Sequence, residues 1–357
     1  MVARVGGDEF MVLLQYIGDS ATSAAFQAEA VSKKIHSLLG QYYDLNGHKH
    51  HSTASIGIAM FGDLQENAEI PMKRAELAMY EAKTAGRNTL RMYHPDMQAA
   101  VRARTSLEDD LREAVLHNEF ILYYQPQVGD QNQLTGVEAL VRWKHPRRGM
   151  VSPAEFIPLA EETGLILPLG SWVLESACTQ LASWAGHSAM SGLSMAVNVS
   201  VRQFFESDFV DQVLAVLERT GANPHRLKLE LTEGMLVSNI EDVITTMTTL
   251  KARGIGFSLD DFGTGYSSLA YLKRLPLQQL KIDQGFVRNI LTDQNDAAIA
   301  RMVIALAQSM GLAVIAEGVE TLQQRDLLAS LGCHAYQGYL FGKPQPIEAF
   351  EVYARRT

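Results

Sequence analysis

From Leu107 onward, short apolar runs alternate with stretches in which apolar residues recur at helical spacing. Eight of the short runs have the length and composition of strands. They are residues 121–126, 136–143, 194–200, 228–232, 256–261, 279–283, 313–317 and 335–339. Eight strands separated mostly by helices over about 250 residues are typical of a (β/α)8 barrel. We therefore predict an α/β protein with a TIM-like barrel over residues 106–357.

The chain before residue 106 has a different pattern. Two apolar runs flank Gly6-Gly7-Asp8-Glu9, and paired glycines followed by an aspartate indicate a β-hairpin turn. Residues 20–39 have helical spacing, with Phe26 and Leu38 on the apolar face, and residues 53–61 are typical of a strand. Pro71 begins a second helix that Gly86 ends. We predict an α+β segment over residues 1–93 and a linker over residues 94–105.

Composition restricts the classes of function. The 357 residues are 47% hydrophobic and 20% charged, as in an ordinary globular protein, and the formal net charge of −9 argues against duplex nucleic acid as a partner. The two cysteines, Cys178 and Cys333, lack metal-binding spacing and indicate a reducing compartment. No apolar run is long enough to span a bilayer. We expect a cytoplasmic protein whose membrane tether or sensor, if it has one, lies outside this chain.

Acidic and amide side chains fall within the predicted barrel strands or at their carboxyl ends. They are Glu138, Asn198, Glu230, Asp260, Asp261, Asp283 and Glu317, and Lys281 shares this position. Any one of these acids, taken alone, is more simply a capping or loop residue. All of them together are expected to converge, because the carboxyl ends of barrel strands open onto one mouth.

A cluster of buried carboxylates needs cations, because the acids otherwise repel one another and take up protons. All the donors are oxygens, which favours hard ions such as Mg²⁺, Mn²⁺ or Ca²⁺ over Zn²⁺, and a carboxylate such as that of Asp260 can bridge two ions. Two ions can activate a water and neutralise charge during phosphoryl transfer. Lys281 can neutralise phosphate charge or orient the water. Ca²⁺ is expected to inhibit, because it prefers looser coordination.

The loop after Asp261 contains two glycines and three hydroxyl side chains, in the sequence Phe262-Gly263-Thr264-Gly265-Tyr266-Ser267-Ser268. Its flexibility and its hydroxyl donors favour a gate over the acids. A plain βα turn is the alternative.

These motifs resemble those of the EAL family of cyclic di-GMP phosphodiesterases over essentially all of residues 106–357. The motifs that carry the resemblance, in chain order, are Glu138-Ala139-Leu140 with Arg142, Asn198-Val199-Ser200, Glu230-Leu231-Thr232-Glu233, Asp260-Asp261-Phe262-Gly263-Thr264-Gly265-Tyr266, Lys281-Ile282-Asp283, Glu317-Gly318-Val319-Glu320 and Gln337-Gly338-Tyr339.

The resemblance implies hydrolysis of cyclic di-GMP to linear pGpG, and it assigns roles to residues of this chain. The implied metal ligands are Glu138, Asn198, Glu230, Asp260 and Asp261. Glu317 and Lys281 complete the catalytic centre, and Glu233 holds the gating loop. Arg142 contacts a substrate phosphate, and Gln125, Gln337 and Asp283 also bind substrate. The family commonly dimerises, so a homodimer is an open expectation.

The first 93 residues resemble part of a GGDEF domain, the diguanylate cyclase family. The likeness is carried by Arg4 to Phe10, by Ser55-Ile56-Gly57-Ile58-Ala59, and by Ala78 to Lys83 with Gly86-Arg87-Asn88. In that family a helix, a strand with a metal-binding aspartate and a further helix precede the hairpin, and residues 1–3 leave no room for them. We therefore expect an incomplete segment, with sheet edges uncovered, that does not cyclise GTP.

Three functions compete at this point. A phosphodiesterase is favoured because every metal ligand that the family implies is present. A non-catalytic receptor for cyclic di-GMP is the alternative, although such receptors usually lose ligands. A diguanylate cyclase is supported only by residues 6–10.

Overall fold

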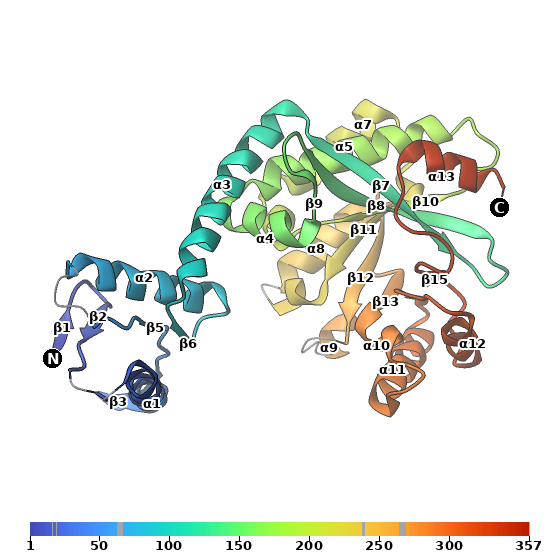
Figure 1. Cartoon of the computed structure of the whole chain (residues 1–357). Coiled ribbons are helices and arrows are strands. Elements are labelled where there is room, and N and C mark those ends of the chain that lie inside the picture. Colours follow the sequence, from blue (N-terminus) through green and yellow to red (C-terminus); the bar gives the residue numbers. More distant parts are fainter. Residues whose placement is uncertain (16, 19, 63–66, 238–239, 264–268, 357) are drawn as a thin grey trace. The chain divides into compact units, whose positions relative to one another are not determined.

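The computed structural model describes residues 1–15, 17–18, 20–62, 67–237, 240–263 and 269–356 (Figure 1). Two compact units divide the chain, Met1–Asp109 and Asp110–Thr357. Helix α3(Pro95–His117) runs through the predicted linker and contains the boundary between the units. Residues 95–105 are thus helical.

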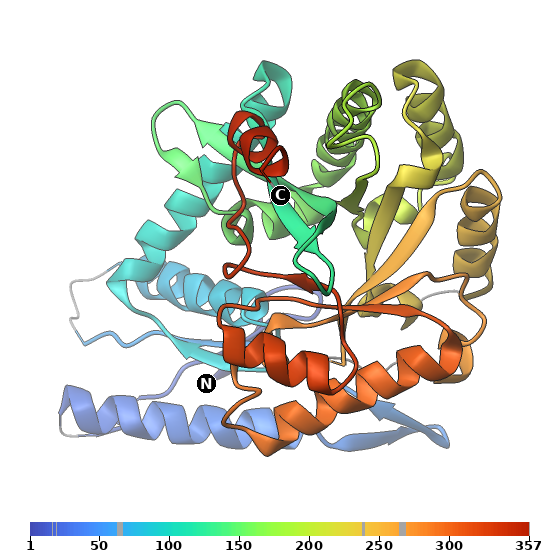
Figure 2. The same ribbon diagram turned by 90° about the vertical axis from the view of Figure 1, so that its right-hand side faces the viewer.

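Eight strands of the second unit close into a barrel (Figures 1 and 2). They are β7(Phe120–Val128), β8(Leu134–His145), β10(Ser194–Asn198), β11(Leu227–Thr232), β12(Gly256–Phe262), β13(Gln279–Ile282), β14(Ala313–Ala316) and β15(Tyr336–Gln337). Closure follows because β8 pairs with both β7 and β10. Each strand coincides with a predicted one, which confirms the TIM-like barrel. The short β9(Gly149–Val151) pairs with the end of β8.

Strand β7 differs from the all-parallel barrel pattern. It runs antiparallel to both of its neighbours, β8 and β15, whereas the other neighbouring pairs in the barrel are parallel. Residues 129–133 join β7 to β8 directly, and Asn132 adopts a positive φ of 59° in this turn. A short turn can connect only antiparallel strands, because a parallel pair needs a crossover. The hairpin puts Gln125 of β7 opposite Glu138 of β8.

Helices cover the outside of the barrel strands (Figure 2). The longer ones are α4(Pro153–Thr163), α5(Ile166–Trp184), α7(Phe209–Thr220), α8(Ile240–Lys251), α11(Gln294–Met310), α12(Leu322–Ser330) and α13(Ile347–Ala354). Short turns of helix follow several strand ends: α6(Val201–Phe204), η2(Glu233–Val237), α9(Leu269–Leu272) and α10(Gln284–Arg288). A further short turn, η1(Pro224–Arg226), directly precedes β11. None of the described helices combines the length and apolar character needed to cross a bilayer.

Aromatic side chains fill the space between barrel and helices. Trp143 of β8 packs edge-on against Phe156 of α4, with ring centroids 5.7 Å apart, and both side chains are fully buried. On another flank, Trp184 of α5 packs against Phe350 of α13 with the two rings tilted at 33° and their centroids 5.5 Å apart. Burial of these large aromatic side chains contributes to the stability of the barrel.

The first unit contains three separate strand pairs in its described residues. β1(Val2–Arg4) and β2(Phe10–Val12) form the predicted hairpin, β3(Tyr42–Leu45) and β4(His48–His51) form a second, and β5(Ile56–Ile58) runs parallel to β6(Leu90–Met92). The second hairpin was not predicted, although Asn46 and Gly47, both at positive φ, are the residues that a type I′ turn requires.

Two helices accompany these strands, α1(Ala21–Leu39) and α2(Glu69–Thr84). α2 lies on β5 and β6, where Gly57 lets the chain approach closely because a Cβ there would sit 2.0 Å from the Ala75 carbonyl oxygen. The predicted apolar face of α1 is not a buried face, since Phe26 is 74% exposed and Leu38 is 50% exposed. The α+β character of the segment is confirmed, but its sheets are small.

Candidate active site

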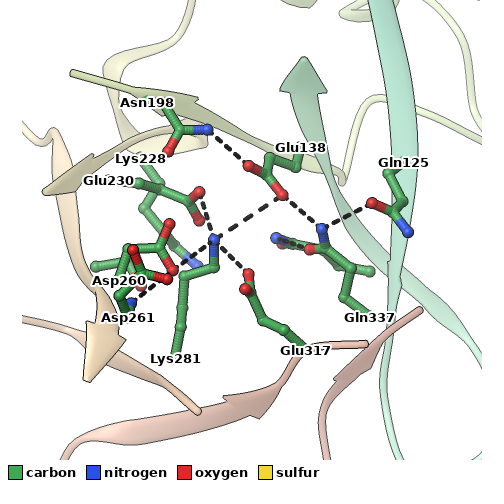
Figure 3. A network of polar contacts seen from close by, with 12 residues as sticks. Gln125, Glu138, Asn198, Lys228, Glu230, Asp260, Asp261, Lys281, Glu317 and Gln337 are labelled. Atoms are coloured by element: carbon green, nitrogen blue, oxygen red, sulfur yellow. Dashed lines mark hydrogen bonds and ion pairs between the residues drawn. The ribbon is translucent and has the colours of Figure 1, made fainter. Parts of the chain in front are cut away.

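Parallel strands bring the predicted acids together at one mouth of the barrel (Figure 3). Asn198 and Glu230 are neighbours in the β10–β11 register, and Asp260 stands opposite Thr232 at the end of β12. Lys281 of β13 and Glu317, which follows β14, complete the ring from the other side. Glu138 reaches in from β8. The convergence predicted from strand position is therefore present.

The Lys281 ammonium group lies at the centre of this ring and is 1% exposed. Its Nζ lies 2.5 Å from Glu317 Oε1, 2.7 Å from Glu230 Oε2, 3.3 Å from Asp260 Oδ1 and 3.9 Å from Glu138 Oε2. One positive charge thus faces four carboxylates. A buried site with this imbalance must bind protons or further cations.

The pKa values of the acids reflect the excess negative charge. Burial, with the charges of Asp260 and Glu138, raises the pKa of Glu317 to about 8. Burial and the same kind of repulsion raise the pKa of Glu230 well above its ordinary value. Burial, Asp260 and Asp283 raise the pKa of Asp261 to about 6. The surrounding carboxylates hold the pKa of Lys281 above its ordinary value against the effect of burial, so the lysine is charged.

Glu138 is the exception among the buried acids. Burial acts to raise its pKa, but the Lys281 charge and hydrogen bonds from Gln337 and Asn198 hold the pKa below its ordinary value. Asn198 Nδ2 donates to Glu138 Oε1 at 2.6 Å, and Gln337 Nε2 donates to Glu138 Oε2. The Asn198 amide oxygen therefore points away from Glu138, as a metal ligand would require.

The end of β12 is irregular, and this aims two consecutive acids at the mouth. The register with β13 shifts between Leu259 and Phe262, and Asp261 adopts a left-handed φ of 53°. Asp261 N donates to Asp260 Oδ1 at 2.9 Å. A regular strand would send adjacent side chains to opposite faces, so the bulge permits both to serve one site.

Three other predicted residues border the acids. Glu233, which is buried, accepts a hydrogen bond from Gly263 N at 3.2 Å and so holds the start of the predicted gating loop. Residues 264–268 of that loop lie outside the described residues. Asp283 caps α10 by accepting from Gly285 N at 2.9 Å, and it lies close enough to Asp261 to help raise the pKa of that carboxyl. Asp283 is thus a neighbour of the acids as well as a predicted substrate contact.

Arg142 and Gln125 lie beside the cluster rather than in it. The Arg142 guanidinium lies over the Tyr123 ring, 5.6 Å from its centroid, and donates to the Val141 carbonyl. It also interacts electrostatically with the Glu138 carboxylate. Gln125 Oε1 accepts from Gln337 Nε2 at 3.1 Å. Gln125 is therefore connected to the acids through Gln337, which also donates to Glu138.

Two interior polar residues were not predicted from the sequence. Lys228 points into the barrel two residues before Glu230, and its Nζ donates to Gln279 Oε1 at 2.6 Å. Gln127 is 3% exposed and donates to Gln337 Oε1 at 2.9 Å. Strand alternation could have found both, since Lys228 shares a face with Glu230 and Gln127 shares one with Gln125.

The second unit is thus a closed α/β barrel, and a ring of carboxylates surrounds Lys281 at its mouth. The chain belongs to the EAL domain family, whose model matches residues 108–344. The model for the diguanylate cyclase GGDEF domain matches residues 1–89. Both resemblances seen in the sequence are confirmed.

Several known proteins are similar to this chain. The bifunctional diguanylate cyclase/cyclic di-GMP phosphodiesterase MucR of Pseudomonas aeruginosa is 43% identical over 97% of this chain and 50% of its own length. The cyclic di-GMP phosphodiesterase PdeR of Escherichia coli is 35% identical over all of this chain and 53% of its own length. The chain thus spans about half the length of these curated relatives.

Solved structures show the same barrel. The PaMucR phosphodiesterase in complex with c-di-GMP has a TM-score of 0.66 and 44% identity, and the match covers 69% of this chain and 99% of that one. The EAL enzyme Bd1971 in its cAMP- and cyclic-di-GMP-bound form has a TM-score of 0.68 and 32% identity, over 81% of this chain and 77% of that one.

Proposed function

We propose that this chain hydrolyses cyclic di-GMP to linear pGpG with the help of divalent cations. The observation that carries the proposal is the ring of four carboxylates around Lys281, which has more negative charge than one lysine can balance. Similarity to MucR and PdeR, both named cyclic di-GMP phosphodiesterases, supports the substrate. The solved complex of PaMucR with c-di-GMP supports it further.

The donor set fits Mg²⁺ or Mn²⁺. Among the described residues, no three acidic, histidine or cysteine side chains are already arranged around a common point as metal ligands, because the carboxylates are turned toward Lys281. The Glu230 Oε1 atom is buried and lacks a hydrogen-bond partner within the described part of the chain. The ligands would be Glu138, Asn198, Glu230, Asp260 and Asp261, all through oxygen, which hard ions prefer. An unpaired buried oxygen and raised carboxyl pKa values both indicate a site that bound cations would stabilise.

Two such ions, when bound, would activate water and neutralise charge on the phosphodiester. The chain's own residues would do the rest. Lys281 holds Glu230 and Glu317 in place and adds a fixed positive charge beside the phosphate. Arg142 would contact a phosphate, while Gln125, Gln337 and Asp283 would orient the nucleotide. Glu233 fixes the loop that borders Asp261.

Residues 1–93 are proposed to be inactive in GTP cyclisation. Their described strands form only two-stranded pairs, and side chains such as Val2, Phe10 and Phe26 are more than half exposed. Two-stranded pairs are marginally stable and give a poor frame for a catalytic site.

The test is incubation of the purified chain with cyclic di-GMP and Mg²⁺ or Mn²⁺, with the products separated by chromatography. We expect pGpG with either ion, none with a chelator, and inhibition by Ca²⁺. Glu138→Ala should abolish turnover while the melting temperature stays near that of the parent, because the side chain lies at the mouth. Tight binding without turnover would instead indicate a receptor, and GTP consumption would contradict the inactivity of residues 1–93.

A further inference from the structure

Three buried amides form a chain that ends on Glu138. Gln127 Nε2 donates to Gln337 Oε1 at 2.9 Å. Gln337 Nε2 donates both to Gln125 Oε1 and to Glu138 Oε2 (Figure 3). All three glutamines are less than a tenth exposed. The oxygen of the Gln337 amide therefore accepts a hydrogen bond from Gln127, and its amino group donates to Gln125 and Glu138.

The orientation of the Gln337 amide follows from donor and acceptor chemistry. The Glu138 carboxylate receives donors on both oxygens, from Asn198 and from Gln337, so it acts as an acceptor only. Gln337 must turn its amino group toward Glu138, and its oxygen then faces Gln127. The only group that Gln127 can offer to that oxygen is its own amino group. Each amide thus fixes the next.

The antiparallel strand β7 creates this arrangement. Gln125 and Gln127 are two residues apart and share the inner face of the strand, and Gln127 pairs with Gln337 in the β7–β15 register. Gly136 lies opposite Gln127 and leaves room for it, since a Cβ at Gly136 would stand 3.1 Å from Gln127 Oε1. A parallel β7 would not present this pair of amides to Gln337 in the same register.

We propose that Gln127 is a positioning residue, which fixes the amide of Gln337 so that its amino group orients the Glu138 carboxylate for a divalent cation. The inference rests on the proposed metal-dependent function. Groups that hydrogen-bond to a metal ligand set its orientation and basicity, and their loss typically weakens metal binding about 10- to 100-fold.

The test measures the affinity of the full chain for Mn²⁺ in the absence of substrate. The protein is titrated with Mn²⁺, and the electron paramagnetic resonance signal reports the concentration of free Mn²⁺. Gln127→Glu keeps the size of the side chain but replaces the donor with an acceptor, so that Gln337 is driven to turn its amino group away from Glu138. Gln127→Met keeps most of the volume and removes the amide, including the donor to Gln337, without adding a charge. Gln203, another buried glutamine, lies on α6, and among the described contacts it makes no hydrogen bond to the acids, so Gln203→Glu and Gln203→Met are matched controls.

We expect Gln127→Glu to raise the Kd for Mn²⁺ at least about tenfold, and Gln127→Met to raise it about three- to tenfold, as for one lost hydrogen bond. The Gln203 variants should keep the parent Kd. A folded Gln127→Glu variant with the parent Kd would overturn the proposal. If that variant does not fold, an unchanged Kd in Gln127→Met overturns it. Failure of the parent to bind Mn²⁺ would instead remove the proposed function, and this inference with it.

Discussion

Glu317 and Asp261 carry a direct sign of crowded negative charge, because burial and neighbouring acids raise their pKa values to about 8 and about 6. In the unfolded chain these groups ionise near their ordinary pKa values of 4.5 and 3.8. Between the ordinary and the raised pKa, the folded state holds a proton that the unfolded state has lost. The free energy of unfolding should therefore fall as the pH rises through that window.

Stability measured in a chelator should thus decline from about pH 5 to about pH 8, with Glu317 contributing at most ~1.4 kcal/mol per pH unit. Glu317→Gln removes this titration, so its melting temperature should fall less steeply over the same range. Saturating Mn²⁺ should flatten the parent curve as well, because the cation replaces the protons. Parallel curves for parent and variant would contradict the raised pKa of Glu317.

The residues of the site were predictable because polar groups at the ends of apolar strands are conspicuous. Asn198 and Glu230 each interrupt a run of aliphatic residues, and Asp260 ends the apolar run that Leu259 closes. The network that joins them was not predictable, since it depends on which amide hydrogen faces which oxygen. Strand alternation places Gln127 on the same face as Gln125, but its contact with Gln337 depends on the antiparallel pairing of β7 with β15, which the sequence pattern does not contain.

Strand β12 contains a bulge that depends on the backbone conformation of one residue, Asp261. Its bulge requires Asp261 at a φ of 53°, a region that Asp and Asn tolerate and that β-branched residues avoid. Asp261→Asn and Asp261→Val remove the same charge but differ in this tolerance. In a chelator, Asp261→Val should have a free energy of unfolding about 1–2 kcal/mol below that of Asp261→Asn. Urea denaturation measures the difference, and equal values would mean that the bulge imposes no strain.

Strand direction and helix faces were the elements that sequence patterns described least well. Alternation of apolar residues predicts a strand but not its direction. The short connection over residues 129–133 is the one feature of the sequence that indicates the β7–β8 hairpin. The apolar face expected for α1 is solvent-exposed at Phe26 because the described strands of that unit build no sheet large enough to cover it. Tertiary context, which periodicity does not contain, decided both.

At the scale of the whole molecule, the chain combines a complete barrel with a smaller α+β unit, and it carries a net charge of −9. The negative charge relevant to cation binding lies at the barrel mouth, where several carboxylates surround the single Lys281 ammonium group. Self-association of the chain stays a prediction. The central claim is that divalent cations are bound by side-chain oxygens at this mouth.

Anomalous X-ray diffraction from crystals grown with Mn²⁺ and cyclic di-GMP tests that claim most directly. The account predicts one or two manganese peaks within coordination distance of Asp260, with Glu138, Asn198 and Glu230 turned toward them. A map without manganese among these oxygens, while cyclic di-GMP occupies the mouth, would contradict the claim.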